Sequence, residues 1–190
     1  VASTLALNVA AYTAGVRTVD MSAVTAAAGN SIDISTFVGT DATTLTGSAT
    51  GSTTITGGAG ADTITGGSAA DTFVASAGND IVSAGSGTVV DAFQFTGALL
   101  EANSGTTATY DGGDGVDTLT VTTAATTLVD ADFRGLTSIE SLITNNGVNS
   151  ITLGSNADAA GIVTITDGTG ADTIVLSDAA FDNTVTINVG

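Results

Sequence analysis

Three successive segments repeat one nine-residue pattern: Gly57-Gly-Ala-Gly-Ala-Asp62-Thr-Ile64-Thr, Gly66-Gly-Ser-Ala-Ala-Asp71-Thr-Phe73-Val and Ala75-Ser-Ala-Gly-Asn-Asp80-Ile-Val82-Ser. Each places an aspartate sixth and an apolar residue eighth. The first fits G-G-x-G-x-D-x-U-x at every fixed position, where U is apolar, and the others lose glycines. So short a period is typical of a chain wound into stacked strands. The sequence therefore predicts an all-β fold, a right-handed parallel β-solenoid (a β-roll or β-helix) with Gly/Asp-rich turns.

The composition agrees with a thin interior. Among 190 residues only 4% are aromatic, there is no Trp, and 25 are Gly. The apolar residues are mostly Ala, Val, Ile and Leu, which suit short stacked strands better than a large layered core. Pro is absent, as expected where every amide is needed for strand pairing.

The strongly negative charge limits which kinds of partner the chain can bind. Lys and Arg number 2 against 19 Asp and Glu, so the formal net charge is −17. Nucleic acid is excluded, because neutralising phosphates requires basic side chains. The mean hydropathy of +0.43 argues against disorder. Divalent cations are therefore the expected partners.

The side chains that several common kinds of catalytic and zinc site require are absent from the sequence. The chain has no His, no Cys and no Lys, which removes the usual zinc ligands, the thiol nucleophile, the Ser-His pair and the Schiff-base amine. We predict no enzymatic activity. Every apolar run is too short to span a membrane, and without a signal-like segment at Val1 we expect a mature product or a piece of a longer protein.

A longer period accompanies the short one. Residues 5–19 align without gaps with residues 151–165, an offset of 146, and residues 31–35 match 173–177 after a small deletion. We predict one solenoid domain over 1–190, part of a tandem array. Its parts are N-terminal coils (1–56), nonapeptide coils (57–95) and C-terminal coils (96–190).

Short strands between Gly, Asn, Asp and Ser turns are the expected elements. A helical turn is predicted at 130–135, with Asp130 as N-cap and Gly135 as stop, and a loop at 98–110. Strands are predicted at 45–46, 53–56, 63–65, 72–74, 93–96, 118–122, 150–153, 163–166, 173–176 and 184–189.

The aspartates carry the candidate chemistry. With two nonapeptides per coil, residues eighteen apart stack, so Asp62 and Asp80 share one edge and Asp71 lies on the other. Asp71 finds its partner in Asp91, whereas Thr53 is expected to break that ladder. Stacked strands are about 4.8 Å apart, where two carboxylates repel by roughly 3 to 4 kcal/mol at a dielectric of about 20. A cation between them reverses the sign.

Calcium suits these turns because it takes hard oxygen ligands, and glycines let backbone carbonyls turn inward. The alternative without a metal is that these Asp side chains bond their own backbone and form Asx-turns. An EF-hand is rejected at Asp111 to Asp117 on spacing, and Glu140 is interpreted as a hydrogen-bonding residue. Asp20, Asp33, Asp41, Asp158, Asp178 and Asp182 are expected in turns or on the surface. The candidate metal-binding residues are Gly57, Gly58, Gly60, Asp62, Gly66, Asp71, Gly78, Asp80, Asp91, Asp114, Asp117 and Asp172.

Residues 57–83 resemble the RTX-type (hemolysin-type) calcium-binding repeat family, with degenerate copies at 84–93, 112–120 and 167–175. The remainder is similar to the repeats of large surface-layer and adhesin-like proteins of Gram-negative bacteria. The resemblance implies Ca²⁺ held by Asp carboxylates and turn carbonyls, type I secretion, and folding outside the cell.

The leading functional hypothesis is a structural module of a secreted bacterial cell-surface protein: an S-layer, a surface filament or a large adhesin. Self-association or contact with neighbouring repeats is expected, because solenoid ends expose strand edges. Two alternatives stay open. One is a β-helix polysaccharide-active enzyme, for which only Arg17 and Arg134 could act as base. The other is a Thr-ladder module that binds ice or another surface, although the Thr54/Thr56 ladder is expected to break after one coil.

Overall fold

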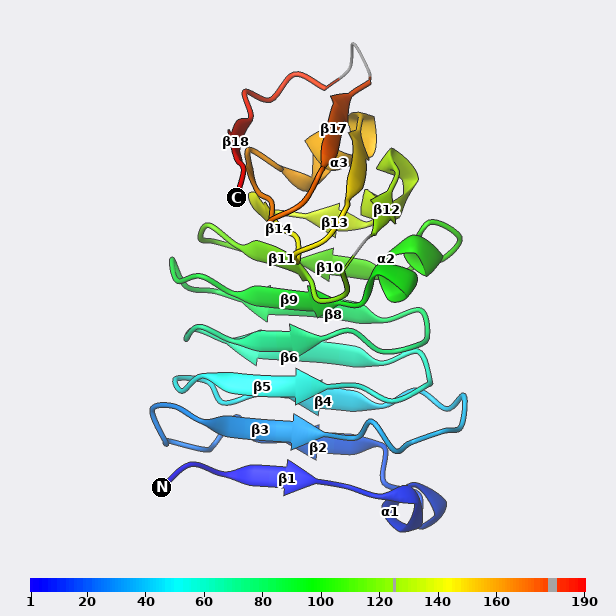
Figure 1. Cartoon of the computed structure of the whole chain (residues 1–190). Coiled ribbons are helices and arrows are strands. Elements are labelled where there is room, and N and C mark those ends of the chain that lie inside the picture. The colour runs from blue at the N-terminus through cyan, green and yellow to red at the C-terminus, as the bar shows by residue number, and fades with distance from the viewer. Residues whose placement is uncertain (125, 178–180) are drawn as a thin grey trace.

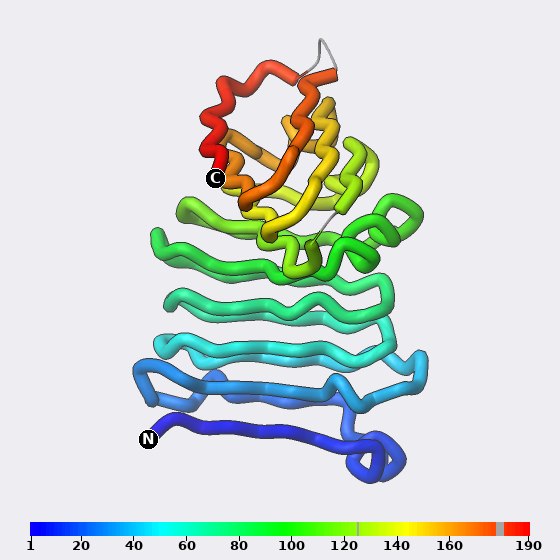
Figure 2. Tube along the Cα trace, in the orientation of Figure 1, coloured from blue at the N-terminus to red at the C-terminus, as the bar shows by residue number. Residues whose placement is uncertain are grey.

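The computed structural model describes residues 1–124, 126–177 and 181–190. All strand pairs recorded there are parallel, as a β-solenoid requires. The coils stack upward from the N-terminus in Figure 1, and the tube in Figure 2 shows the same path without side chains. The predicted fold class, an all-β parallel solenoid, is confirmed.

The strands form three sheets. Sheet A has the order β1 (Thr4–Ala6), β3 (Asn30–Asp33), β5 (Thr53–Thr56), β7 (Thr72–Val74), β9 (Ala92–Phe95), β11 (Thr118–Val121), β14 (Ser141–Ile143), β16 (Thr164–Thr166) and β18 (Thr186–Asn188). Sheet B runs through β2 (Thr18–Asp20), β4 (Thr44–Thr46), β6 (Thr63–Gly67), β8 (Ile81–Gly85), β10 (Thr109–Asp111) and β13 (Leu136–Thr137). Sheet C comprises β12 (Thr127–Leu128), β15 (Ser150–Leu153) and β17 (Thr173–Leu176).

The interior is built from single rows of apolar side chains. In sheet A, Ile55, Phe73, Phe93 and Leu119 lie in register on successive coils, and each is at most 3% exposed. The rings of Phe73 and Phe93 stack with centroids 5.1 Å apart. Side chains alternate between the two faces of a strand, so residues two places apart share a face. The residue two places after the buried aspartate of the repeat therefore points inward as well. This geometry accounts for the apolar eighth position of the repeat.

Helices are inserted where a coil is longer than the minimum. They are α1 (Val9–Thr13), α2 (Gly97–Asn103), α3 (Ser155–Ala160) and the 3-10 turn η1 (Asp130–Phe133). Both α1 and α2 connect a sheet A strand to a sheet B strand, and they project on the same side of the solenoid (Figure 1). The loop predicted at 98–110 is therefore wrong in part: Thr96 Oγ1 accepts the Leu99 N–H at 3.2 Å, and Leu100 is fully buried.

Asp130 caps a different helix from the one predicted. In η1 the preceding Val129 is the N-cap, and its N–H donates to Asp132 Oδ2 at 2.8 Å. Asp130 reaches the next coil instead, where Oδ1 accepts the N–H groups of Gly154 (2.8 Å) and Ala157 (3.0 Å) at the start of α3. Its role as N-cap of its own turn is thus wrong, because stacking offers the carboxylate a better set of donors on the neighbouring coil. Gly135, at φ +75°, ends the turn as predicted.

The internal sequence match has a structural counterpart. Residues 5–19 form strand, helix and strand (β1, α1, β2), and residues 151–165 form β15, α3 and β16. Leu5 pairs with Ile32 in sheet A, and the matching Ile151 pairs with Ile174 in sheet C. The second copy therefore repeats the local order of the first, with sheets C and A in place of A and B. The division into parts of a longer array stays a prediction.

Candidate metal sites along the turns

Carboxylates form a ladder where the chain passes from sheet B to sheet A, here called the B-to-A edge. Its rungs are Asp71, Asp91, Asp117 and Glu140, one on each successive coil. One carboxylate oxygen of each rung accepts the backbone N–H of the preceding rung. The bonds are Thr53 N to Asp71 Oδ1 (2.6 Å), Asp71 N to Asp91 Oδ1 (2.6 Å), Asp91 N to Asp117 Oδ1 (2.7 Å) and Asp117 N to Glu140 Oε2 (2.8 Å).

Two further edges repeat this arrangement. On the A-to-B edge, Asp62 Oδ1 accepts the Thr43 N–H and Asp80 Oδ1 accepts the Asp62 N–H, each at 2.9 Å. On the A-to-C edge, Asn149 Oδ1 accepts the Thr126 N–H at 3.1 Å and Asp172 Oδ1 accepts the Asn149 N–H at 2.7 Å. One rule therefore governs these three edges: a polar side chain at the end of a turn binds the amide of the coil before it.

The predicted stacking of Asp62 on Asp80 and of Asp71 on Asp91 is confirmed by these bonds. Thr53 ends the series of carboxylates, as expected, but the hydrogen bonds continue through it. Thr53 donates its backbone N–H to Asp71, and any residue other than Pro can supply that group. What ends at Thr53 is only the series of carboxylates.

The second oxygen of each aspartate separates two kinds of rung. Asp62 Oδ2 accepts the Gly58 N–H at 2.8 Å, and Asp80 Oδ2 accepts the Ser76 hydroxyl at 3.0 Å. In contrast, Asp71 Oδ2 and Asp117 Oδ2 are buried without a hydrogen-bond partner in the described chain. A buried carboxylate oxygen without a partner costs free energy unless a cation or a donor satisfies it.

The pKa values of the rung aspartates show that their charged forms are disfavoured. Burial raises the pKa of Asp71, Asp80 and Asp117 to about 6, and the neighbouring carboxylates Asp91, Asp62 and Glu140 add to the respective shifts. Burial also raises the pKa of Asp62 and Asp91. Desolvation and like charge both favour the neutral form, and a bound cation would oppose both.

Glycines bring backbone oxygens close to these carboxylates. A methyl group on Gly66 would lie 2.5 Å from Asp71 Oδ2 and would overlap the carbonyl oxygen of Ala84 on the next coil. On Gly57 it would lie 2.9 Å from Asp62 Oδ2 and 2.5 Å from the Ser76 hydroxyl. Only glycine at these positions leaves room for oxygens from two coils to converge.

A hollow of about 230 Å³ opens at the turns of the A-to-B edge. Its lining includes Gly57, Gly58 and Ala59 of one coil and Ala75, Ser76 and Ala77 of the next. Two of these residues, Gly58 and Ser76, hold the second oxygens of Asp62 and Asp80. The stacked nonapeptide turns thus enclose a small space bordered by carboxylate partners.

The donor set fits a hard cation. Within the described residues no group of three acidic side chains converges on one point. A calcium ion held at these turns would also need backbone carbonyls as ligands. Calcium accepts such mixed sets of carboxylate and carbonyl oxygens. Asp62 with Asp80, and Asp71 with Asp91, would hold it together with the adjoining turns. These ligand assignments stay predictions.

The remaining candidate metal-binding residues are Gly60, Gly78, Asp172 and Asp114. Gly60 and Gly78 stack on the same edge, where a methyl group on Gly78, at φ +123°, would overlap the Gly60 carbonyl oxygen. Asp172 is a half-buried rung of the A-to-C edge. Asp114 differs from them, because it is exposed within its turn while Asp117 forms the rung.

Of the acids expected in turns or on the surface, Asp20 and Asp33 accept the N–H two residues ahead and are Asx-turns, as predicted. Asp41 instead forms an ion pair with Arg17 at 2.6 Å, and this guanidinium holds the pKa of the exposed carboxyl below its ordinary value. Asp158 accepts the Asp182 N–H at 3.0 Å. Asp178 lies outside the described residues.

Sequence reasoning missed Glu140 and Asn149 as rungs, although a signal was present. Glu140-Ser-Leu142 and Asn149-Ser-Ile151 have the polar-x-apolar spacing of Asp62-Thr-Ile64. Searching for any acceptor side chain two residues before an apolar residue would have found both. Glu140 is a hydrogen-bonding residue, as interpreted from the sequence.

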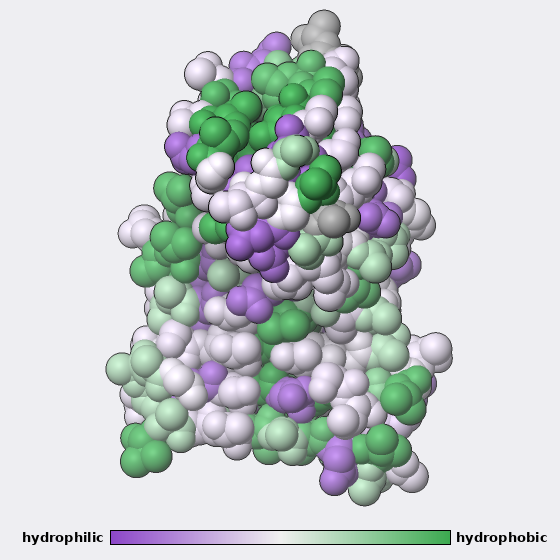
Figure 3. Space-filling view, in the orientation of Figure 1, coloured by the Kyte–Doolittle hydropathy of each residue, from purple (hydrophilic) through white to green (hydrophobic). Residues whose placement is uncertain are grey.

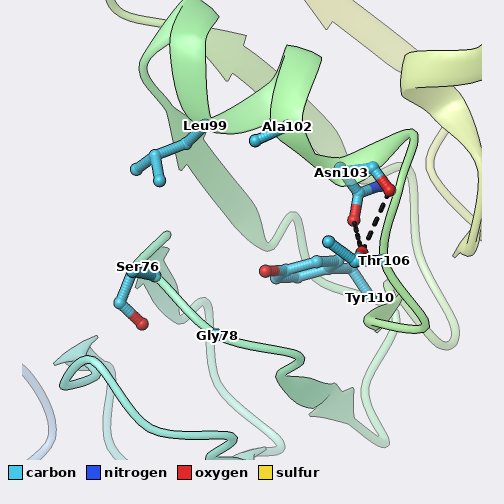
Figure 4. Close-up of a pocket in the computed structure, with 8 residues that line it drawn as sticks. Ser76, Gly78, Leu99, Ala102, Asn103, Thr106 and Tyr110 are labelled. Atoms are coloured by element: carbon cyan, nitrogen blue, oxygen red, sulfur yellow. Dashed lines mark hydrogen bonds between the residues drawn. The ribbon is translucent and has the colours of Figure 1, made fainter. Parts of the chain in front are cut away.

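The carboxylates of the A-to-B edge end at a second hollow, of about 140 Å³ (Figure 4). The Tyr110 hydroxyl points into it between Leu99 of α2 and the turn at Ser76 and Gly78. Burial and the negative charge of Asp80 raise the pKa of Tyr110. The α2 insertion thus covers the last nonapeptide turn with a largely apolar wall.

Replacing Gly66 with Ala is expected to destabilise the calcium-loaded protein by about 2 to 3 kcal/mol, because the methyl group overlaps oxygens of two coils. Gly105→Ala is the matched control: its methyl group has only one neighbour within 4 Å, at 3.9 Å. Urea unfolding in millimolar calcium measures both variants. Equal urea midpoints for the Gly66→Ala and Gly105→Ala variants would show that the turn at Gly66 tolerates a methyl group.

Residues 48–82 match the family model of the RTX calcium-binding nonapeptide repeat (4 copies). The search of curated proteins and the search of solved structures each gave no match. The matched segment includes the rungs Asp62, Asp71 and Asp80, and it extends the nonapeptide series back to the copy that ends at Thr53-Thr-Ile55-Thr. Residues 48–82 therefore carry RTX-type calcium-binding nonapeptide repeats.

Proposed function

We propose that the chain is a non-catalytic structural module of a secreted bacterial cell-surface protein (an S-layer, a surface filament or a large adhesin) in which calcium drives folding and assembly. The observation that carries this proposal is the buried carboxylate ladder, whose second oxygens at Asp71 and Asp117 have no partner. RTX repeats are typical of secreted proteins, which supports an extracellular location and export by type I secretion. No helix in the described parts of the chain is long and apolar enough to cross a membrane.

The arginines favour a structural role over an enzymatic one. Arg17 Nη2 contacts Asp41 at 2.6 Å, and its guanidinium lies 4.1 Å from the centroid of the Tyr12 ring. This arrangement ties α1 to the coil above and leaves the guanidinium poorly placed to remove a substrate proton. Arg134 follows η1 on the surface. A polysaccharide-active enzyme would need a basic group within an acidic cleft, and neither arginine offers one.

Self-association is supported by the apolar residues at the C-terminal end. Val175, Leu176, Ile187 and Val189 are each more than 40% exposed there. Figure 3 shows hydrophobic surface gathered at this end of the solenoid. Leu153 and Ile165, which precede Leu176 and Ile187 in the same rows, are fully buried. A neighbouring repeat would bury the terminal rows and pair the free edges of β17 and β18.

The proposal is tested by light scattering and negative-stain electron microscopy of the purified chain with calcium and with EGTA. We expect extended particles that lengthen with protein concentration in calcium, and monomers in EGTA. Calcium-loaded protein that stays monomeric at all concentrations would contradict assembly through this chain. Calcium binding itself is measured separately.

One observation favours a second candidate, the Thr-ladder module. The first outward position of the sheet A strands carries a hydroxyl on every strand except β9, where Ala92 stands: Thr4, Ser31, Thr54, Thr72, Thr118, Ser141, Thr164 and Thr186. The neighbouring row is irregular, since Thr56 pairs with Val74 as predicted. Thermal hysteresis in the calcium-loaded protein would support ice binding, and its absence favours the structural module.

A further inference from the structure

We propose that the B-to-A edge holds a cation site beyond the matched nonapeptide segment, formed by the carboxylates of Asp117 and Glu140 and the backbone carbonyl of Ser138. Residues 48–82 end well before this site, and Glu140 belongs to no nonapeptide. The inference rests on the proposed function only in assuming that the protein meets millimolar calcium. It adds a ligand of a different type, a glutamate, at the end of the ladder.

Asp117 supplies the first group. It is fully buried, and its Oδ1 accepts the Asp91 N–H at 2.7 Å. Its Oδ2 is buried without a partner in the described chain. Asp117 therefore uses one carboxylate oxygen to bind the preceding coil, and the other remains available to a ligand between Asp117 and the following coil.

Glu140 supplies the second group from that following coil. Its Oε2 accepts the Asp117 N–H at 2.8 Å, which brings the two carboxylates to adjacent coils of one edge. The turn before β14 has only three residues, 138–140, whereas the turn before β11 has the six residues 112–117. Glutamate is longer than aspartate by one methylene, and this extra length suits a rung that stands on the shorter turn.

Ser138 supplies the third group. It has φ +53°, the only positive value among the described residues other than glycine. A methyl group on Gly112 would overlap the Ser138 carbonyl oxygen and would lie 2.6 Å from Asp117 Oδ2. The two oxygens therefore converge on the same face of Gly112, a position that only glycine leaves open. An oxygen pair of this kind, with Glu140 beside it, is a hard-cation donor set.

A purely structural role leaves the observations incomplete. As a hydrogen-bond acceptor Glu140 explains the Asp117 N–H, but it does not satisfy Asp117 Oδ2. The charged groups that act on Asp117 are the carboxylates of Asp91, Glu140 and Asp111. The buried carboxylate of Asp117 thus faces only negative charges, and a divalent cation would satisfy both its charge and its free oxygen.

Calcium stoichiometry by native mass spectrometry tests the site. Glu140→Gln keeps an oxygen to accept the Asp117 N–H but removes the charge, so we expect one calcium fewer than in the wild type. Glu101→Gln is the matched control, because Glu101 is the only other glutamate and lies exposed on α2. It should retain the wild-type number. Gly112→Ala, which fills the space between the oxygens, should lose the same ion as Glu140→Gln.

Two outcomes overturn the inference, and they are distinguishable. If Asp80→Asn loses calcium while Glu140→Gln and the wild type hold equal numbers, this site is absent and the nonapeptide sites stand. If the wild type binds no calcium at all, both the site and the proposed function fail. Circular dichroism at about pH 5 in EGTA shows whether each variant is folded. Glu140→Gln should melt there no lower than the wild type, because it retains the hydrogen bond.

Discussion

At pH 7.5, EGTA is expected to abolish most of the β-sheet circular dichroism of this chain, and millimolar calcium to restore it. Without calcium the rungs Asp62, Asp71, Asp80, Asp91 and Asp117 stand as stacked buried carboxylates, all with a raised pKa. The thin interior offers little to offset that repulsion. Folding and binding are therefore expected to occur together.

The expected magnitude follows from linkage. A site at one hundred times its dissociation constant adds about 2.7 kcal/mol to the free energy of unfolding. Two or three such sites contribute about 5 to 8 kcal/mol, which is comparable to the whole stability of a typical domain. Chelation is thus expected to leave the chain at or below the folding threshold.

Calorimetry across a calcium titration provides the measurement, with magnesium as the ionic control. Magnesium is smaller and demands near-octahedral geometry, so it should restore much less structure at equal concentration. A chain that melts at the same temperature in EGTA and in calcium would show that the aspartates serve only as hydrogen-bond acceptors.

The calcium-free protein is expected to be more stable at about pH 5 than at pH 7.5, the reverse of most acidic proteins. The folded pKa of Asp71, Asp80 and Asp117 is about 6, above the ordinary value of 3.8. Between these values the folded state binds more protons than the unfolded state. The stability that these groups contribute is therefore fully present below the unfolded pKa and is lost as pH rises through about 6.

The whole shift of about two units corresponds to at most about 3 kcal/mol, but only about one unit of it, roughly 1.4 kcal/mol, is lost between about pH 5 and pH 7.5. Because the edges lie close to solvent, screening reduces this to roughly 0.5 to 1 kcal/mol for each group. The three together make about 1.5 to 3 kcal/mol. The folded fraction in EGTA, followed by β-sheet circular dichroism between about pH 5 and pH 7.5, measures the difference. Higher stability at pH 7.5 would contradict the raised pKa values.

Calcium should reverse this pH dependence, because the ion binds the deprotonated carboxylates and releases their protons. In millimolar calcium we expect stability to rise between about pH 5 and pH 7.5. Isothermal titration calorimetry in buffers of different ionisation enthalpy measures the released protons at about pH 6. No release would show that the titrating groups are not the ligands.

The nonapeptides determined how much could be predicted. Strands β5, β7, β15 and β17 fall at the predicted residues, and the stacking of Asp62 on Asp80 follows from the eighteen-residue spacing. Within the nonapeptides the predictions succeed because a regular repeat has one register. The apolar eighth position must point inward, and this fixes which residues share an edge.

Elsewhere the spacing between coils is irregular, and prediction failed for that reason. Asp117 is 26 residues from Asp91, and Glu140 is 23 from Asp117. A helix such as α2 lengthens one coil without changing its stacking, so spacing alone does not reveal the partner. Strands β1, β2, β3, β8, β10, β12, β13 and β14 were not predicted, because no regular repeat surrounds most of them.

The side-chain hydrogen bonds of the four rungs on the B-to-A edge all run in one direction, from the amide of a coil to the side chain of the coil that follows. A coil is therefore incomplete until its successor in sequence has arrived. Among these side-chain bonds, loss of the Glu140 carboxylate leaves the Asp117 amide without its acceptor, whereas loss of the Thr53 amide leaves the Asp71 carboxylate free to meet water or an ion. The two ends of the ladder therefore differ in what they need: the amide at its C-terminal end requires a side chain from the next coil, and the carboxylate at its N-terminal end requires none.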